Sequence, residues 1–200
     1  MPDRTTTLDP NRTALLVMDY QNGIVGQLPG SGALLDRVST VIDDVRGRGA
    51  HVGWVRVGFE DAEFEAIPET SMFAPYAASA EHRAVMRADG PATQIHPKLA
   101  PRPEDVQVRK IRVGAFTTTD LGQQLEKRGI TTLVLAGIST SGVVLSTVRE
   151  AMDRDYRIVV LRDACADRDQ ATHDFLTGTL FPRTATVVDV AELSGHWDVQ

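Results

Sequence analysis

The chain has 200 residues, of which 42% are hydrophobic and 24% are charged, with a net charge of -6 at pH 7. This length suits one domain with a substantial core, and we expect a single domain over residues 1–200. The acidic balance argues against nucleic acid as a partner, because binding to phosphates depends on basic side chains.

The N-terminal stretch MPDRTTTLDPNR is polar and lacks the apolar core of a signal peptide. No apolar run approaches the roughly 20 residues that are needed to cross a bilayer. Cys165 is the single cysteine, so no intrachain disulfide can form, which suits a reducing compartment. We therefore expect a cytoplasmic protein without a membrane partner.

Short apolar segments alternate with segments of helical periodicity along the chain, which predicts parallel βαβ units with helices on both faces of the sheet. The expected strands are 13–19, 51–59, 106–110, 131–137, 156–163 and 184–189. The expected helices follow LLDRVSTVIDDVRGRG, LGQQLEKRG, SGVVLSTVREAMDRD and DQATHDFLTGTLF. The connection 60–104 is long for a link between strands, so we expect a lid or an interface element with one helix near AEHRAVMRADG.

Charged residues stand at the ends of two expected strands. Asp19 ends the first strand and Lys110 ends the third. Periodicity does not give the order of the strands; in the order 3-2-1-4-5-6, ligands would bind beyond the strand ends, between the first and fourth strands. Alone, Asp19 could cap a turn and Lys110 could be a surface cation, but together they could form a general acid/base pair. Burial would raise the pKa of Asp19 unless a cation is near.

The turn after the fourth strand runs through Ser139, Thr140, Ser141 and Gly142 into a helix. The first N–H groups of a helix have no partners within it, so they could stabilise a developing oxyanion. Alternatively, Ser139 or Thr140 simply caps the helix. The two interpretations are compatible, because a cap and an oxyanion site have the same geometry.

Three stretches resemble the isochorismatase-like hydrolase superfamily, which includes isochorismatases, nicotinamidases and other cysteine amidases. They are LLVMDYQNG, then RKIRVGAFTTTDLGQQLEKRGITTLVLAG, then ISTSGVVLSTVREAMDRDYRIVVLRDACAD. The resemblance implies a doubly wound α/β fold with a six-stranded parallel sheet in the order 3-2-1-4-5-6. It also implies an active site at the strand ends and a homo-oligomer, such as a dimer or a tetramer.

The resemblance implies roles for individual residues as well. Asp19 and Lys110 correspond to two members of the family's catalytic Asp-Lys-Cys set. Gln21 and Phe116 fall on motif positions near the pocket. The bond between Ile138 and Ser139 is where the family often has a cis peptide.

The third catalytic member is missing. The resemblance places Val143 at the cysteine position, and a valine side chain cannot attack a substrate. Cys165 does not replace it, because it follows the fifth expected strand in the small-residue turn DACAD and is expected to be a buried packing residue. Ser141 could face the site, but a serine nucleophile needs a base within reach, and Asp19 is the only evident candidate.

We expect no metal and no other cofactor. The histidines are scattered, without a pair at ligand spacing, and the stretch GQLPGSG does not match a phosphate-binding loop. Arg56 and Glu60 either border the pocket or form a solvated ion pair.

Four aromatic residues lie near the long connection. Phe59, Phe64, Phe73 and Tyr76 either wall the pocket or pack the connection against the body of the protein.

Three functional hypotheses remain. The leading one is a cofactor-independent hydrolase of a small organic molecule, such as a vinyl ether or a related C–O or C–N compound, that uses Asp19 and Lys110 without a cysteine. The second is a catalytically silent relative that binds a small ligand or serves as a scaffold. The third is an amidase with Ser141 as its nucleophile.

Overall fold

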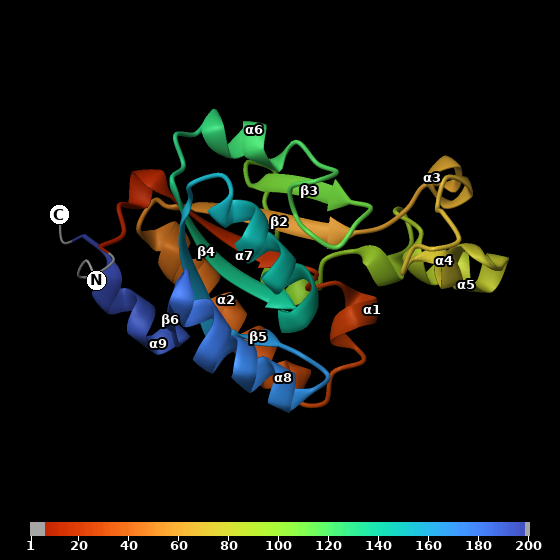
Figure 1. Ribbon diagram of the computed structural model, residues 1–200. Helices are drawn as coiled ribbons and strands as arrows, with labels where there is room; N and C mark the ends of the chain where they lie inside the picture. The colour runs from red at the N-terminus through yellow and green to blue at the C-terminus, as the bar shows by residue number, and fades with distance from the viewer. Residues whose placement is uncertain (1–6, 199–200) are drawn as a thin grey trace.

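The centre of the molecule is a six-stranded parallel sheet in the order β3-β2-β1-β4-β5-β6, seen in a computed structural model that describes residues 7–198 (Figure 1). The order that the resemblance implied is confirmed. The strands are β1 (Thr13–Met18), β2 (His51–Val57), β3 (Val106–Lys110), β4 (Thr132–Ile138), β5 (Arg157–Ala166) and β6 (Thr186–Val188).

Helices cover both faces of this sheet, as expected for parallel strands. The α-helices are α1 (Asn22–Val25), α2 (Ser31–Gly47), α3 (Asp61–Glu65), α4 (Ala74–Ala77), α5 (Ala80–Met86), α6 (Leu121–Glu126), α7 (Leu145–Met152), α8 (Gln170–Phe175) and α9 (Val190–Leu193). Shorter 3-10 or π-helical turns are η1 (Pro10–Arg12), η2 (Pro91–Thr93), η3 (Pro97–Leu99), η4 (Thr140–Val144), η5 (Leu176–Leu180), η6 (Phe181–Arg183) and η7 (Ser194–His196).

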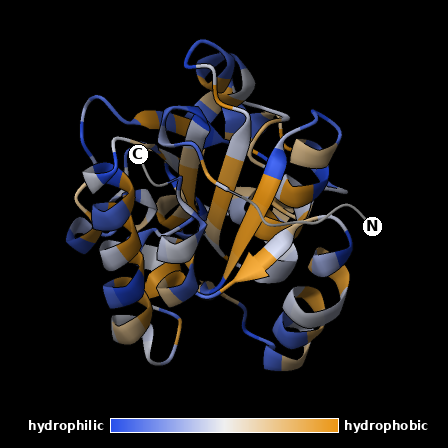
Figure 2. Cartoon of the chain, turned by 90° about the vertical axis from the view of Figure 1, so that its left-hand side faces the viewer, coloured by the Kyte–Doolittle hydropathy of each residue, from blue (hydrophilic) through white to orange (hydrophobic). Residues whose placement is uncertain are grey.

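The strand sequences are apolar because the strands lie between two layers of helices. Every residue of β1 and β4 is buried. Leu15 and Val17 of β1 belong to the core under α2, whereas Leu16 and Met18 belong to the core under α6 and α7. Figure 2 shows hydrophobic strands between helices whose outer sides are largely hydrophilic.

Two strands end more than one residue away from the expected position. β2 ends at Val57 rather than at residue 59, because the N–H of Phe59 donates to the carbonyl of Met86 at 2.8 Å and the chain leaves the sheet. β5 continues to Ala166, because the β4–β5 register shifts between Leu135 and Gly137 and pairing then resumes. Cys165 therefore lies within β5, and the expectation that it follows the strand in a turn is wrong.

The connection 60–104 contains three short α-helices, α3, α4 and α5, where one was expected. These helices project beyond the end of β2 (Figure 1). A cluster of Phe59, Phe64 and Phe73 joins the projection to the body. Within residues 7–198, no helix has the length and apolar character that a membrane span requires.

Candidate active site

The structure brings Asp19 and Lys110 together. The Lys110 Nζ lies 2.9 Å from the Asp19 Oδ2, and both side chains are buried, with exposed fractions of 2% and 7%. The Lys110 Nζ also donates to the carbonyl of Arg112 at 3.2 Å. Among the described residues, the Asp19 Oδ1 has no hydrogen-bond partner although it is buried.

The backbone explains how the two residues meet across the sheet. β2 lies between β1 and β3, so the pair has to bridge two strand spacings of about 4.8 Å each. Asp19 has a φ of 60°, in the left-handed region that aspartate tolerates better than most residues. Its N–H donates to the carbonyl of Val55 at 2.8 Å, which holds this turn of the chain against β2. The long stem of Lys110 covers the remaining distance.

Burial raises the pKa of the Asp19 carboxyl, although the charge of Lys110 and its hydrogen bond act in the opposite direction. Desolvation is therefore the larger effect at this carboxyl. Asp19 accepts a proton more readily than an exposed aspartate does, and its unpaired Oδ1 is an available position for that proton.

The turn after β4 has the features that the family resemblance implied. The Ile138–Ser139 peptide bond is cis, which confirms that expectation. Val143 lies in the π-helical turn η4 and is 2% exposed, within the core under α7. Close packing of this turn depends on Gly137, because a Cβ at that position would lie 2.8 Å from the Val144 Cγ2.

Some of the first N–H groups of this turn already donate to acceptors within the protein. The N–H of Ser141 donates to the Asp167 Oδ2 at 2.7 Å, and the side chain of Ser139 caps none of the N–H groups. Burial acts to raise the pKa of Asp167, but hydrogen bonds from Ser141, Asp169 and Arg168 outweigh it and hold the pKa below its usual value. One of the donors considered for an oxyanion is thus occupied by a carboxylate.

A second contact behind this turn was not anticipated. The Thr140 Oγ1 lies 2.8 Å from the Nδ1 of His173, and both residues are buried. Burial lowers the pKa of His173, which favours the neutral form of the ring. Within residues 7–198, no group of three or more histidine, cysteine, aspartate or glutamate side chains is arranged to hold a metal ion.

Helix α7 also holds the loop that follows Lys110. The N–H of Ala115 donates to the Thr147 Oγ1 at 3.2 Å, and the N–H of Phe116 donates to the Glu150 Oε2 at 3.1 Å. The same helix follows the turn that contains Val143. Thr147 and Glu150 were missed as supporting residues because helical periodicity does not reveal which loop a polar side chain contacts.

The side chain of Gln21 forms hydrogen bonds with the protein's own backbone. Its amide Nε2 donates to the carbonyls of Val57 at 2.7 Å and Thr93 at 2.9 Å, and its Oε1 accepts from the N–H of Val57 at 2.8 Å. The side chain joins the end of β2 to η2. These hydrogen bonds give Gln21 a structural role two residues after Asp19.

The aromatic residues of the long connection pack on one another. The ring of Phe59 lies 5.3 Å from those of Phe64 and Phe73, measured between centroids. Ile111 and Val113, which follow Lys110, pack against this cluster. The cluster therefore adjoins the loop that begins at the catalytic candidate Lys110.

Phe116 is directed elsewhere. Its ring stacks on Tyr156 at a centroid distance of 5.8 Å, and the guanidinium of Arg154 lies 4.8 Å from the ring centroid. Both neighbours precede β5 and so lie near the edge where the strands begin. The structure does not bring Phe116 to the Asp19–Lys110 pair.

Arg56 and Glu60 do not pair with each other. The Arg56 Nη1 donates to the carbonyl of Ala88 at 2.8 Å, whereas Glu60 binds Arg109 at 3.1 Å. Arg56 lies opposite Arg109 in the β2–β3 register, on the other face of the sheet from Lys110. The solvated ion pair considered for Arg56 and Glu60 is therefore absent among the described residues.

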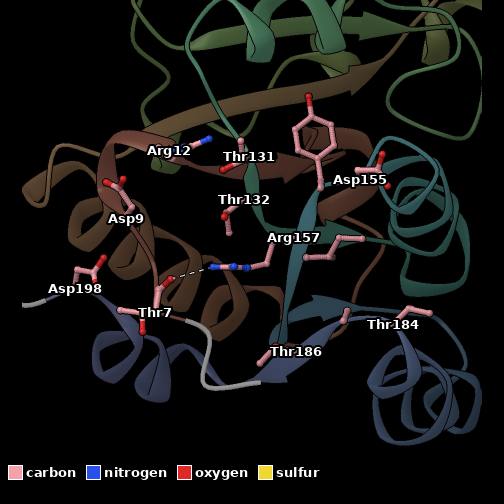
Figure 3. A pocket seen from close by; sticks show the side chains of 13 residues that line it. Thr7, Asp9, Arg12, Thr131, Thr132, Asp155, Arg157, Thr184, Thr186 and Asp198 are labelled. Atoms are coloured by element: carbon pink, nitrogen blue, oxygen red, sulfur yellow. Dashed lines mark hydrogen bonds between the residues drawn. The ribbon is translucent and has the colours of Figure 1, made fainter. Parts of the chain in front are cut away.

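A cavity of about 780 Å³ lies at the opposite edge of the sheet (Figure 3). Thr131 and Thr132, at the start of β4, and Arg157, at the start of β5, line it, and Arg157 donates to the carbonyl of Thr7 at 3.4 Å. Ligands of doubly wound sheets bind beyond the carboxyl ends of the strands, not at this edge. The Asp19–Lys110 region is therefore the better candidate for an active site.

Comparisons with known proteins agree with this fold. The isochorismatase domain family matches residues 13–192. The chain is 34% identical to YwoC of Bacillus subtilis, an uncharacterized isochorismatase family protein, with 90% of each chain covered. It is 32% identical to a ureidoacrylate amidohydrolase of Methylobacterium radiotolerans, with 78% of this chain and 68% of that protein covered.

A solved structure is similar over nearly the whole chain. It is that of an isochorismatase family protein from Burkholderia thailandensis, with a TM-score of 0.82 and 32% identity. The alignment covers 95% of this chain and 97% of that one.

Proposed function

Because the chain belongs to the isochorismatase family of hydrolases, we propose that it hydrolyses a small organic molecule with Asp19 and Lys110, without a cofactor or a cysteine nucleophile. The observation that carries the proposal is the buried carboxyl of Asp19, with one oxygen on Lys110 and the other without a partner among the described residues. A buried carboxyl with a raised pKa is the group that general acid catalysis near neutral pH requires.

A vinyl ether is the substrate class that this chemistry fits best. The Asp19 carboxyl transfers its proton to the enol carbon, which leaves an oxocarbenium ion and an aspartate carboxylate. Water adds to the cation and returns a proton to Asp19, and the resulting hemiacetal or hemiketal breaks down to a carbonyl compound and an alcohol. Lys110 stabilises the carboxylate that forms in the first step. A positioned acid of this kind contributes typically about 10² to 10⁴-fold in rate.

Related C–N bonds form the second part of the proposed substrate class. One relative is named as a ureidoacrylate amidohydrolase. In this chain Val143 excludes an acyl-enzyme at the cysteine position, so water has to attack directly. Gln21, Arg56, Phe59 and Phe116 were expected to bind substrate; of these, Phe59 is supported by its contact with the residues after Lys110.

The proposal is tested with Asp19→Asn and a panel of vinyl ethers, amides and imides. We expect the variant to lose turnover of any substrate that the wild type hydrolyses, while its urea unfolding curve stays that of a folded protein. Asp43→Asn, at an exposed position of α2, is the matched control and keeps wild-type turnover. Unaltered turnover in Asp19→Asn would refute the proposed mechanism.

Val143 favours a second candidate, a silent relative that binds a small ligand. A valine in the core under α7 supplies packing but no chemistry. Saturable binding of panel compounds without turnover would support this alternative over the first.

The third candidate uses Ser141 as a nucleophile. The hydrogen bond from its N–H to Asp167 places an acidic side chain beside it, whereas the base considered from the sequence was Asp19. A covalent adduct on Ser141, detected by mass spectrometry, would support this route. Wild-type turnover in Ser141→Ala would exclude it.

The assembly and setting of the protein complete the proposal. We propose one domain over 1–200, a homo-oligomer of two or four copies, and a cytoplasmic location without nucleic acid or membrane as a partner. Met72 and Val85 of the projection are 67% and 51% exposed, which supports a role of residues 60–104 as a lid or in subunit contact. Sedimentation velocity measures the number of copies directly.

A further inference from the structure

A second cleft lies away from the Asp19–Lys110 pair. Arg56 and Arg109 are opposite each other on β2 and β3, while their neighbours Val57 and Lys110 pair on the other face of the sheet. The cleft has a volume of about 760 Å³ and lies between these strands and the projecting segment 60–104. A ligand in it would contact a different face of the sheet from that of Lys110.

Three arginines line this cleft, and the positive charges of two of them are balanced by carboxylates. Each of the two is held by two carboxylates: Arg109 by Glu60 at 3.1 Å and Glu63 at 2.5 Å, and Arg87 by Asp61 at 2.7 Å and Asp89 at 3.1 Å. Their guanidinium groups need no further counter-charge.

Arg56 differs from the other two. Its one hydrogen bond within the described part of the chain goes to the carbonyl of Ala88, and no carboxylate there lies within ion-pair distance. Burial and the nearby charge of Arg109 lower its pKa. A half-buried guanidinium without a counter-charge is unfavourable, so the free protein has a position that an anionic group would improve.

The rim of the cleft limits which anion fits. The carboxylates of Glu60, Asp61 and Asp89 line the cleft, and Glu63 adds a fourth on Arg109, so that four carboxylates face three guanidinium groups. Those of Asp61 and Asp89 are 73% and 76% exposed. A doubly charged phosphate would be repelled by this rim. A single carboxylate can form a bidentate pair with Arg56, and a cationic group on the same molecule would be attracted to Asp61 and Asp89.

We propose that this cleft binds a small amino carboxylate, with its carboxylate on Arg56 and its ammonium group toward Asp61 and Asp89. Such a ligand supplies the missing counter-charge and matches the acidic rim in one molecule. The site is separate from the proposed catalytic pair, so it does not depend on the proposed hydrolysis.

β-Alanine is the probe that tests this site, in titrations followed by calorimetry or by NMR. We expect saturable binding to the wild type, weaker binding of propionate, which lacks the ammonium group, and no saturable binding of inorganic phosphate. Arg56→Gln keeps a donor for the carbonyl of Ala88 but loses the charge, and it should bind β-alanine at least about tenfold more weakly. The control Arg149→Gln, at an exposed position of α7, should bind as the wild type does.

Several results would overturn the proposal. These are the absence of saturable β-alanine binding at millimolar concentration, equal binding by Arg56→Gln, and phosphate binding as strong as that of β-alanine. Sedimentation provides a further test: if the wild type is an oligomer that Arg56→Gln dissociates, the counter-charge comes from a second copy and not from a small ligand. An unchanged urea unfolding curve ensures that Arg56→Gln is compared as a folded protein.

Discussion

Cys165 is a residue whose surroundings remove its usual reactivity. Burial raises the pKa of its thiol to about 12, and its Sγ contacts the carbonyl of Leu135 at 3.8 Å. Because the thiolate is the reactive form, we expect iodoacetamide to leave the folded protein unlabelled near pH 8 and to label it once in urea. Intact-mass spectrometry measures the adduct. Rapid labelling of the folded protein would show that the thiol is accessible, contrary to its position in β5.

The residue scale also shows what the sequence could predict about the site. Asp19 and Lys110 could be placed because Asp19 directly follows β1 and Lys110 ends β3, and strand ends share one edge of a parallel sheet. The contacts of Asp167 and His173 could not be predicted, because they depend on how α8 and the end of β5 lie against η4. The face of the sheet on which Arg56 lies could not be predicted either. It depends on the register between β2 and β3, which a strand assignment alone does not give.

At the scale of elements, the turn between β4 and α7 depends on close approach of backbone and side chains. In Gly137→Ala the new Cβ would lie 2.8 Å from Val144 and 3.3 Å from Met18, so we expect a loss of about 1 to 3 kcal/mol in the free energy of unfolding. The matched control is Gly32→Ala in α2, where a Cβ meets no atom within 4 Å and should stabilise the protein by about 0.4 to 1 kcal/mol. Urea unfolding of both variants measures the difference. Equal effects at the two positions would contradict the packing at Gly137.

The elements themselves were predicted well where periodicity or apolar runs were continuous. β1 and β4 are buried on both faces, so their apolar runs identify them. The end of β5 was placed too early, because the register shift between Leu135 and Gly137 leaves no mark in the sequence. The short helices α3 and α4 were missed because each is too short for helical periodicity to appear.

At the scale of the whole molecule, the buried ion pair links the pH dependence of stability to the strand ends. Lys110→Met removes both effects that lower the pKa of Asp19, so desolvation raises that pKa further. A folded-state pKa above the unfolded one means that the folded protein binds more protons between the two values, so its stability falls as pH rises through that window. Above the window, an unpaired buried carboxylate costs about 3 to 5 kcal/mol relative to the wild type.

A comparison with Asp19→Asn/Lys110→Met isolates this effect, because the double variant has no carboxyl at position 19 and no ammonium at position 110. We expect the single variant to lose stability relative to the double variant as pH rises through the raised pKa of Asp19, since only the single variant then carries a buried, unpaired carboxylate. Urea unfolding at several pH values measures this difference. A difference that stays constant with pH would mean that the pKa of Asp19 is not raised by burial, and the raised pKa that general acid catalysis requires would lose its support.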